Sequence, residues 1–334
     1  MLKVYYPVDP PSQPFQEEKA AWDLLYARLD PRIELITGEK LPQPAEYQIL
    51  VNGRPTAEQI NASPVLHTLI IPWAGLSVSA GDLLKQYPHL KVHNLHYNAV
   101  TTAETAVMLL LMAAKLIIPV ERQFRQHDWR PRYLYPNPSL MLQGKTALLL
   151  GYGSIGQHVG KVCQAMGMRV MATRRTLEVE DLADPVAEVY PAGELHRLLP
   201  QANVLLITLP LTDDTNSLIG QKELDLLPEN AILVNIGRGQ IVDQEALYQA
   251  LKSGRLHSAG LDVWYNYPPD EASREYTPPA DFPFHELDNV VMSPHRGGGS
   301  MEIDLLQMEY LADMLNLAAQ GQPLPNKVYP ERGY

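Results

Sequence analysis

The 334-residue sequence contains one cysteine, Cys163, so the chain cannot form an internal disulfide bond. Its most apolar stretch, Ala106–Val120, is interrupted by Lys115 and is shorter than the roughly 20 residues that span a bilayer. We interpret this stretch as a buried helix and expect no membrane association. The first residues, Met1–Tyr6, lack the long apolar region of a signal peptide. These absences favour a cytoplasmic protein.

Positive charge is also scarce. The chain has 27 lysines and arginines against 38 aspartates and glutamates, and its formal net charge is -11. Because nucleic-acid binding depends on a dense surface of lysine and arginine, we do not expect a nucleic-acid partner. The closely spaced His93 and His96 would face opposite sides of a strand, which argues against a metal site.

The length and the apolar pattern predict two α/β domains. A chain of this size exceeds the limit at which one hydrophobic core stops growing, and short Val, Ile and Leu runs alternate with helical patterns, as in parallel sheets covered on both faces. The first series of expected strands is Leu2–Val8, Ile33–Ile36, Tyr47–Val51, Leu66–Pro72 and Leu90–Asn94, with helices at Gln16–Leu29 and Ser79–Gln86. The second series is Thr146–Leu150, Arg169–Thr173, Val204–Leu209, Ala231–Asn235, Ala259–Val263 and Val290–Ser293.

Two further helices connect the series. The helical pattern Thr102–Ile118 lies between them, and Met301–Ala319 follows the second. We therefore expect one domain formed by residues 1–101 and 299–334, completed by the C-terminal helix, and a second domain, residues 102–298, inserted into it.

A glycine-rich turn follows the first strand of the second series. The segment Gly151-Tyr152-Gly153-Ser154-Ile155-Gly156 precedes the helical pattern Gln157–Met166. In this context the first glycine permits a tight turn, the second lets the backbone approach a pyrophosphate, and the third lets helix and strand pack closely. Free N–H groups at the start of the helix attract phosphate. The motif predicts a Rossmann dinucleotide-binding domain.

The next strand suggests which dinucleotide is bound. NAD-binding versions end this strand with Asp or Glu, which accepts hydrogen bonds from the ribose hydroxyls, whereas this chain has Thr173-Arg174-Arg175. Guanidinium groups bind a 2′-phosphate bidentately. We therefore expect NADP as the cofactor, with NAD still possible. The alternative is that Arg174 and Arg175 are solvated surface charges.

Three later segments, Asn235–Asp243, Gly260–Val263 and Ser293–His295, resemble the ordered signatures of the D-isomer-specific 2-hydroxyacid dehydrogenases. The resemblance implies that the Rossmann domain is inserted into a flavodoxin-like substrate domain. It also implies hydride transfer between a nicotinamide cofactor and a small 2-oxo or 2-hydroxy acid, as in glyoxylate and hydroxypyruvate reductases. A homodimer is expected on the same grounds, with helix Thr102–Ile118 as a plausible contact.

The resemblance also implies residue roles. Arg238 pairs with the substrate carboxylate, for which its planar fork of donors is suited, and His295 is the acid/base, since its ordinary pKa near 6.5 suits proton exchange at neutral pH. Asp262 corresponds to the residue near the nicotinamide. Further cofactor-contact positions are Ser154, Ile155, Leu209, Pro210, Ile236, Gly237 and Gly297, together with Arg238 and His295.

The turn Trp73-Ala74-Gly75-Leu76 resembles the family's substrate-carboxylate turn, in which backbone N–H groups face the ligand. Trp73 stands where a glycine is common. It either projects into the pocket or is a buried core tryptophan. His96, Tyr97 and Asn98 are additional candidates for the pocket wall.

The chain departs from the family beside His295. Tyr267 stands where the glutamate partner of the catalytic histidine is expected. A tyrosine hydroxyl can orient the ring but supplies no negative charge, so we expect His295 to titrate lower than in glutamate-bearing relatives. The following segment, Asp270–Pro283, is longer than usual and forms either a lid or subunit contact, or a passive surface loop.

Two other functions stay open. Formate dehydrogenases, related by fold, also lack this glutamate, although they pair the histidine with glutamine; Asn98 matches an asparagine in that group. Some dehydrogenase-like corepressors sense NAD(H) without turnover, and the altered position of Tyr267 is compatible with that role. Retention of both Arg238 and His295 favours an enzyme.

Overall fold

The structure is a computed structural model that describes residues 1–8, 16–177 and 179–333. Its contacts divide the chain into two compact units. Unit 1 comprises Met1–Asn98 and Gly299–Tyr334, and unit 2 comprises Ala99–Gly298. Each unit contains one sheet with helices packed on both faces.

In unit 1 the strand order of the described residues is β13-β5-β4-β3-β1-β2, with every pair parallel except β13 with β5. This order, with β1 between β2 and β3, is that of flavodoxin-like sheets. The strands are β1 (Leu2–Tyr6), β2 (Ile33–Thr37), β3 (Ile49–Val51), β4 (Thr68–Ile71), β5 (Lys91–Asn94) and β13 (Lys327–Val328). The helices are α1 (Gln16–Arg28), α2 (Ala57–Ala62), α3 (Val78–Leu84) and α10 (Ile303–Ala319).

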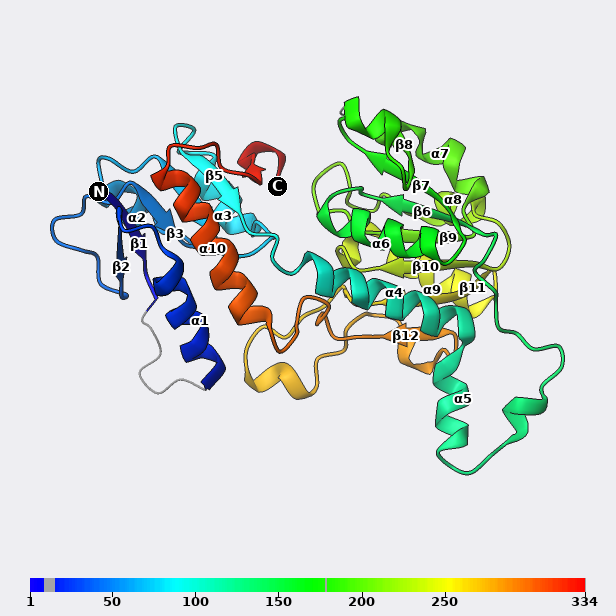
Figure 1. Cartoon of the computed structure of the whole chain (residues 1–334). Coiled ribbons are helices and arrows are strands. Elements are labelled where there is room, and N and C mark those ends of the chain that lie inside the picture. Colours follow the sequence, from blue (N-terminus) through cyan, green and yellow to red (C-terminus); the bar gives the residue numbers. More distant parts are fainter. Residues whose placement is uncertain (9–15, 178, 334) are drawn as a thin grey trace. The chain divides into compact units, whose positions relative to one another are not determined.

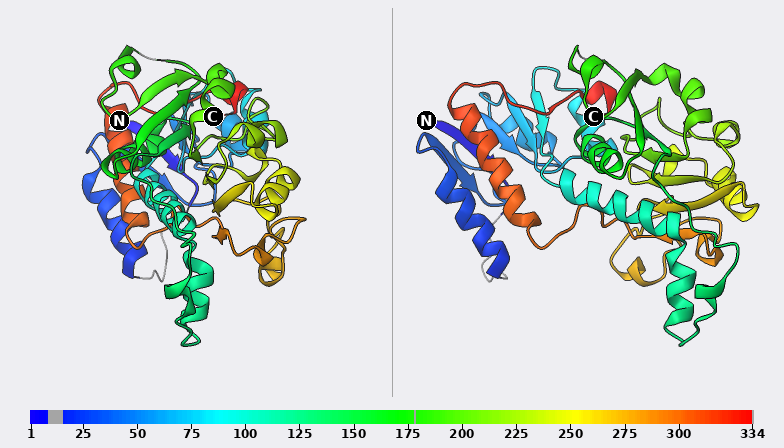
Figure 2. Two further views of the ribbon diagram at one scale, coloured as in Figure 1. Left: turned by 90° about the vertical axis from the view of Figure 1, so that its right-hand side faces the viewer. Right: turned by 45° about the vertical axis from the view of Figure 1, so that its right-hand side comes forward.

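Alternating side chains of these strands reach opposite faces of the sheet. Val4 and Tyr6 pack into the same cluster as residues of α1 and α10, whereas Tyr5 between them belongs to the cluster on the other face, as the two-residue period of a strand requires. Helices α1 and α10 lie side by side on their face of the sheet in all views (Figures 1 and 2).

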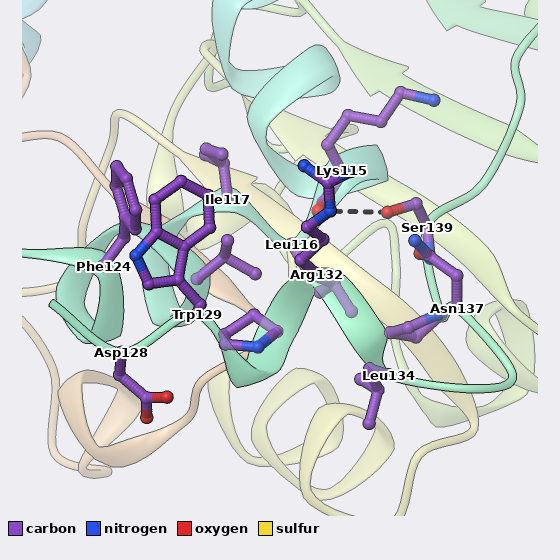
Figure 3. Close-up of a pocket in the computed structure, with 13 residues that line it drawn as sticks. Lys115, Leu116, Ile117, Phe124, Asp128, Trp129, Arg132, Leu134, Asn137 and Ser139 are labelled. Carbon is purple, nitrogen blue, oxygen red and sulfur yellow. Dashed lines mark hydrogen bonds between the residues drawn. The ribbon is translucent and has the colours of Figure 1, made fainter.

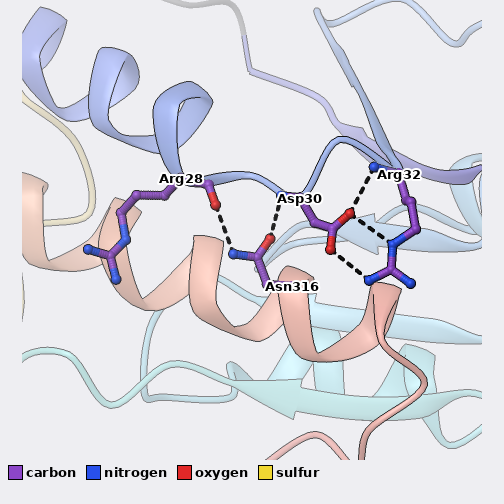
Figure 4. A network of polar contacts seen from close by, with 4 residues as sticks. All are labelled: Arg28, Asp30, Arg32 and Asn316. Carbon is purple, nitrogen blue, oxygen red and sulfur yellow. Dashed lines mark hydrogen bonds and ion pairs between the residues drawn. The ribbon is translucent and has the colours of Figure 1, made fainter.

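A polar network joins α10 to the end of α1 (Figure 4). Asn316 of α10 donates to the carbonyl oxygen of Arg28 at 2.8 Å and accepts the backbone N–H of Asp30 at 2.7 Å. The Asp30 carboxylate in turn binds the guanidinium of Arg32, and this ion pair lowers the pKa of Asp30 to about 2. The C-terminal helix therefore pairs with the last carbonyl oxygen of α1, which the helix leaves unpaired, and with a backbone N–H of the loop that follows it.

In unit 2 the strand order of the described residues is β12-β11-β10-β9-β6-β7-β8, and all pairs are parallel. This is the Rossmann order, with a switch point between β6 and β9, where ligands bind at the carboxyl ends of the strands. The strands are β6 (Thr146–Leu150), β7 (Arg169–Arg174), β8 (Glu188–Pro191), β9 (Val204–Ile207), β10 (Ala231–Asn235), β11 (Leu256–Leu261) and β12 (Val290–Met292). The helices are α4 (Ala99–Lys115), α5 (Ile117–Phe124), α6 (Ser154–Ala165), α7 (Leu195–Leu198), α8 (Gln221–Leu226) and α9 (Gln244–Lys252).

The apolar stretch Ala106–Val120 is not one buried helix, and the expected helix Thr102–Ile118 is wrong at its end. Helix α4 ends at Lys115, Leu116 adopts a left-handed conformation with φ of 47°, and α5 continues at an angle of 72° with no buried residue. Within the described residues no single helix is long and apolar enough to cross a membrane; α4 and α5 meet that test only as a bent pair.

Candidate functional site

The glycine turn after β6 is shaped by close backbone contacts. Gly151 has φ of 96°, and a Cβ atom on Gly156 would lie 2.2 Å from the carbonyl oxygen of Gly151, so neither position accepts a side chain. Thr208, after β9, donates its hydroxyl to the same oxygen at 2.7 Å. Around Gly153, by contrast, a Cβ atom would meet nothing within 4 Å. The turn is tight where the backbone packs and open where a pyrophosphate would approach the start of α6, so the residues fit a dinucleotide.

The end of β7 carries the two arginines expected to select NADP. Arg174 donates to the buried carboxylate of Asp181 at 2.6 Å, and Arg175 pairs with the exposed Asp214 at 3.3 Å. Thr173 is buried within the strand. The guanidinium of Arg174 is about one third exposed and has further N–H donors besides the one that binds Asp181.

Asn235, the last residue of β10, fixes the turn that presents Arg238. Its side chain accepts the backbone N–H of Gly237 at 3.0 Å and donates to the carbonyl oxygen of Arg238 at 2.9 Å. A Cβ atom on Gly237 would lie 2.5 Å from the carbonyl oxygen of Leu209, which places the turns after β9 and β10 against each other. Arg238 uses one Nη1 donor on the carbonyl oxygen of Gly237 at 2.7 Å, and its remaining donors suit an anion.

Asp262, after β11, organises the loop after β12. Its buried carboxylate accepts the Ser293 hydroxyl at 2.5 Å, the backbone N–H of Arg296 at 3.0 Å and that of Gly297 at 2.9 Å. Both of its oxygens are thus committed to the loop on either side of His295. His295 itself has φ of 52°, a left-handed conformation that is uncommon for a residue with a side chain.

Tyr267 contacts the ring of His295 directly. The tyrosine hydroxyl lies 2.9 Å from Nδ1 of His295 and accepts the backbone N–H of Trp264 at 3.2 Å. Trp264 is buried and donates its indole N–H to the carbonyl oxygen of Ser293 at 2.8 Å. Tyr267 therefore orients the imidazole from one side while Trp264 holds the loop that carries it.

The electrostatics of this group favour a neutral imidazole. Burial lowers the pKa of His295, the nearby Arg238 guanidinium lowers it further, and the Asp262 carboxylate opposes these effects only in part. Burial raises the pKa of Tyr267, so its hydroxyl keeps its proton near neutral pH. Unit 2 thus brings together the Arg238 cation, the titratable His295 ring and the neutral Tyr267 hydroxyl, and Asp262 supports the loop that carries His295.

The turn after β4 belongs to unit 1. Trp73 is 38% exposed, and a Cβ atom on Gly53 would lie 1.9 Å from its ring, so the indole packs against Gly53 in the loop after β3. This exposure excludes the interpretation of Trp73 as a buried core residue. Asn94 and Gln307 donate to the carbonyl oxygens of Ala74 and Pro72, each at 2.6 Å.

A model of the family described as "D-isomer specific 2-hydroxyacid dehydrogenase, NAD binding domain" matches residues 107–297. The chain belongs to this family. The matched range lies within unit 2 and contains the glycine turn, Arg238, Asp262, Tyr267 and His295.

Curated relatives agree with this assignment. The chain is 34% identical over 235 residues to the glyoxylate reductase of Korarchaeum cryptofilum, covering 69% of this chain and 66% of the relative. It is 32% identical over 307 residues to the D-3-phosphoglycerate dehydrogenase of Archaeoglobus fulgidus, covering 89% of this chain and 55% of the relative. The chain thus spans two thirds or less of the length of these relatives.

Solved structures share the fold over the whole chain. A D-isomer specific 2-hydroxyacid dehydrogenase from Xanthobacter autotrophicus Py2, in complex with NADPH and MES, has a TM-score of 0.77 and 23% identity and covers 100% of this chain and 99% of its own. An NADPH-dependent glyoxylate/hydroxypyruvate reductase from Sinorhizobium meliloti, in complex with NADP and sulfate, has a TM-score of 0.74 and 21% identity, with 100% coverage of both chains.

Residues 116–140, which follow α4, form an arm that carries both apolar and charged side chains. Phe124 and Trp129 meet edge to face, with ring centroids 4.9 Å apart, and both are more than half exposed. A pocket of about 450 Å³ opens beside them (Figure 3). Lys115 lines this pocket and donates from Nζ to the carbonyl oxygen of Leu140 at 2.7 Å.

The long segment after Tyr267 is fixed at its base. The carbonyl oxygen of Pro279 accepts the backbone N–H groups of Tyr265 and Asn266 at 3.1 and 3.0 Å, and Phe284 is buried against aromatic side chains. Tyr276 nearer the tip is 86% exposed. The segment is a surface excursion with a rigid attachment, and a lid function stays a prediction.

Ser293, Trp264 and Thr208 were not among the candidates from sequence. Each acts by holding backbone: Ser293 and Trp264 support the loop of His295, and Thr208 supports the glycine turn. Ser293 lies two residues before His295 in the signature Ser293–His295, and this proximity is its only sequence signal. No sequence signal links Trp264 or Thr208 to their partners, because the contacts join separate strands.

Proposed function

We propose that this protein is an oxidoreductase that transfers a hydride between NADP(H) and a small 2-oxo or 2-hydroxy acid, with D-isomer specificity. The proposal rests on the grouping of Arg238, His295 and Tyr267. A 2-oxo acid needs a cation to bind its carboxylate and a proton donor for its carbonyl oxygen, and Arg238 and His295 are suited to these two roles. Glyoxylate and hydroxypyruvate are the substrates we favour, from the similarity to glyoxylate reductases.

In the proposed mechanism Arg238 pairs with the substrate carboxylate and polarises the adjacent carbonyl. His295 gives the proton on Nε2 to the oxygen as negative charge develops there, and it takes the proton back in the reverse direction. Tyr267, at Nδ1, fixes the plane of the ring and replaces the family's glutamate without its charge. The glycine turn and the start of α6 would hold the pyrophosphate of NADPH, and the bound cofactor would supply the hydride.

NADP is the proposed cofactor. Support comes from Arg174 and Arg175 at the end of β7, where NAD-binding relatives have an acidic residue. The pairing of Arg174 with Asp181 leaves guanidinium donors for a 2′-phosphate. Two structures of similar fold were solved with NADPH or NADP, which agrees with this choice.

A homodimer is the proposed assembly. Exposed side chains of α4 recur at helical spacing along one face, and exposed apolar side chains follow in the arm, among charged neighbours. Large apolar surfaces of this kind mark protein contacts, and a second copy of the chain is the simplest partner. The exposed positions are Val100, Glu104, Met108, Leu111, Ile117, Val120, Phe124, Trp129 and Tyr133. Leu111→Asp combined with Trp129→Asp should halve the mass measured by light scattering; an unchanged dimer would contradict this surface.

The function is tested by NADPH consumption with glyoxylate, hydroxypyruvate, pyruvate and bulkier 2-oxo acids. We expect turnover that falls at least 1000-fold, roughly 4 kcal/mol of transition-state stabilisation, in Arg238→Gln and in His295→Asn. His285→Asn, which changes an exposed histidine in the 3-10 helix Phe284–Glu286, ten residues before His295, is the matched control. NADPH binding without turnover would favour a sensor, and NADP reduction by formate would favour a formate dehydrogenase.

A further inference from the structure

The hydroxyl of Tyr267 lies between two nitrogen atoms. It accepts the backbone N–H of Trp264 at 3.2 Å, and it lies 2.9 Å from Nδ1 of His295. Within the described residues these are its two hydrogen-bond partners, and Tyr267 is in turn the one partner of the His295 ring nitrogens. Arg238 and Asp262 act on the ring through their charge. The hydrogen bond to Tyr267 therefore determines which ring nitrogen carries the proton when the ring is neutral.

The backbone of Trp264 is held in place by contacts on two sides. Its buried indole donates to the carbonyl oxygen of Ser293, two residues before His295, at 2.8 Å. A Cβ atom on Gly239 would lie 2.2 Å from the carbonyl oxygen of Trp264, so the turn after β10 packs against this backbone. Trp264 therefore keeps its N–H directed at Tyr267 and also fixes the loop that carries the imidazole.

The proton of the Tyr267 hydroxyl gives the direction of the second hydrogen bond. Burial raises the pKa of Tyr267, so the hydroxyl keeps its proton near neutral pH, and a phenol has one proton to donate. The oxygen already accepts the N–H of Trp264. Its own proton has an acceptor when it points at Nδ1 of His295, whereas an Nδ1–H group would leave it without one among the described residues. Nδ1 is then the acceptor, and the proton of the neutral ring is on Nε2.

A carboxylate beside Nδ1 would have the opposite effect. An ionised carboxylate has no proton to donate, so it accepts an Nδ1–H group and leaves a lone pair on Nε2. A neutral ring with that lone pair repels a carbonyl oxygen, whereas an Nε2–H group donates to it. With Tyr267 in this position, the His295 ring remains a donor at Nε2 after it has lost its charge.

We propose that Tyr267, directed by the backbone N–H of Trp264, holds neutral His295 in its Nε2–H form, so that the site binds a carbonyl oxygen whether the ring is charged or neutral. Tyr267 is a positioning residue in this role, since it acts through the imidazole. The inference rests on the proposed function for the identity of the ligand, a 2-oxo acid whose carbonyl oxygen meets Nε2. Its consequence is that loss of the ring's charge slows proton transfer but does not weaken binding of the 2-oxo acid.

15N NMR of protein labelled in its histidine rings tests the proton position directly, because protonated and unprotonated ring nitrogens give well-separated signals. Spectra are taken at about pH 8.5, where a histidine of ordinary pKa is neutral, and His295→Asn assigns the signals. Two other histidines are references for the two forms. Nδ1 of His93 faces the carbonyl oxygen of Pro325 at 2.7 Å, and Nε2 of His196 faces the carboxylate of Glu223 at 2.8 Å. Both acceptors require an N–H group, so His93 has its proton on Nδ1 and His196 has its proton on Nε2.

We expect wild-type His295 to match the pattern of His196, with the Nε2–H form as the major one. A pattern like that of His93, or equal amounts of the two forms, would overturn the proposal. Tyr267→Glu should reverse the pattern, and Tyr267→Phe should bring the two forms closer to equal amounts. An Nε2–H form that persists in Tyr267→Glu would also count against the proposal, and the wild-type spectrum decides the question if a variant does not fold.

Binding gives a second test. Oxamate, an unreactive analogue of a 2-oxo acid, is titrated into the NADPH complex below and above the midpoint of the pH profile of reduction. Its Kd should change less than fivefold while kcat falls at least tenfold. A Kd that rises in parallel with the loss of kcat would show that the neutral ring presents no donor.

The spectra need no turnover, so failure of this inference and failure of the proposed function are distinguishable. A protein that reduces no 2-oxo acid would refute the proposed function, and the spectra would still report the proton position of His295. An active reductase with its proton on Nδ1 would refute this inference and leave the proposed function in place.

Discussion

The carboxylate of Asp262 accepts the backbone N–H of Gly297 at 2.9 Å, and this contact joins the end of β11 to the loop that carries His295. The same carboxylate binds the N–H of Arg296, also after the histidine, and the hydroxyl of Ser293 before it. A buried carboxylate with three donors is a strong anchor, because hydrogen bonds to charged groups are stronger than neutral ones. Family resemblance assigns Asp262 to the nicotinamide, whereas its contacts in the structure suggest that it also holds His295 in its left-handed conformation.

Asp262→Asn should therefore lower kcat at least tenfold. The amide of the variant would turn an N–H group toward one of the loop's own N–H donors, and the loop would lose its charge-assisted bonds, at a stability cost of about 1.5–3 kcal/mol. Steady-state kinetics and urea denaturation check both effects. Ser293→Ala, which removes only one donor, should have the smaller effect. A kcat within twofold of wild type in Asp262→Asn would show that the anchor is dispensable.

The rate of reduction should fall at a lower pH than the ordinary histidine pKa predicts. Protonated His295 is the proposed acid, and its pKa lies below the ordinary value because of burial and Arg238. The protonated fraction, and with it the reduction rate, is lost as pH rises through a value below about 6.5. Oxidation needs the neutral ring and should persist to lower pH. A reduction rate that stays flat to about pH 9 would contradict this assignment.

Tyr267→Glu should move that midpoint upward by about 1 to 2 pH units, because a carboxylate beside Nδ1 favours the imidazolium. Tyr267→Phe is the matched variant: it removes the hydrogen bond but adds no charge, so its rate should fall without an upward shift. Equal midpoints in the Glu and Phe variants would mean that position 267 does not control the titration of His295.

Arg174→Ala should raise the KM for NADP at least tenfold, about 1.4 kcal/mol of binding free energy, and leave the KM for NAD nearly unchanged. The reason is the loss of guanidinium donors for the 2′-phosphate. Arg169→Ala, at the other end of β7, where the arginine pairs with Glu188, is the control. A strong preference of wild type for NADH in side-by-side Michaelis constants would remove the basis for this prediction.

Asn316→Ala should lower the free energy of unfolding by about 1 to 2 kcal/mol, because two hydrogen bonds to the backbone after α1 are lost. Asp313 lies on the same helix as Asn316 and forms an exposed ion pair with Arg28 of α1. Asp313→Ala removes this pair and should cost less than about 1 kcal/mol. Denaturant unfolding followed by circular dichroism measures both. Equal costs would mean that Asn316 does not bridge the two helices in solution.

Most strands were predictable because parallel strands buried on both faces are short apolar runs. Strands β6 and β10 have the expected limits at both ends, whereas β9 ends at Ile207, two residues early, where the turn toward the site begins. The exposed β8 and the two-residue β13 have no apolar run and were missed. The break at Leu116 was also missed, since an apolar run continues across it.

The sequence by itself determined the two α/β units, the glycine turn and the family, because short-range order and residue type are enough for these features. Only the tertiary structure decided what surrounds each candidate. It showed that Tyr267 reaches Nδ1 of His295, that Asp262 binds the loop on either side of that histidine, and that Gln307 reaches Pro72 across 235 residues. Such contacts depend on which strand ends lie next to one another, and strand order is set by packing of the whole sheet rather than by any local pattern.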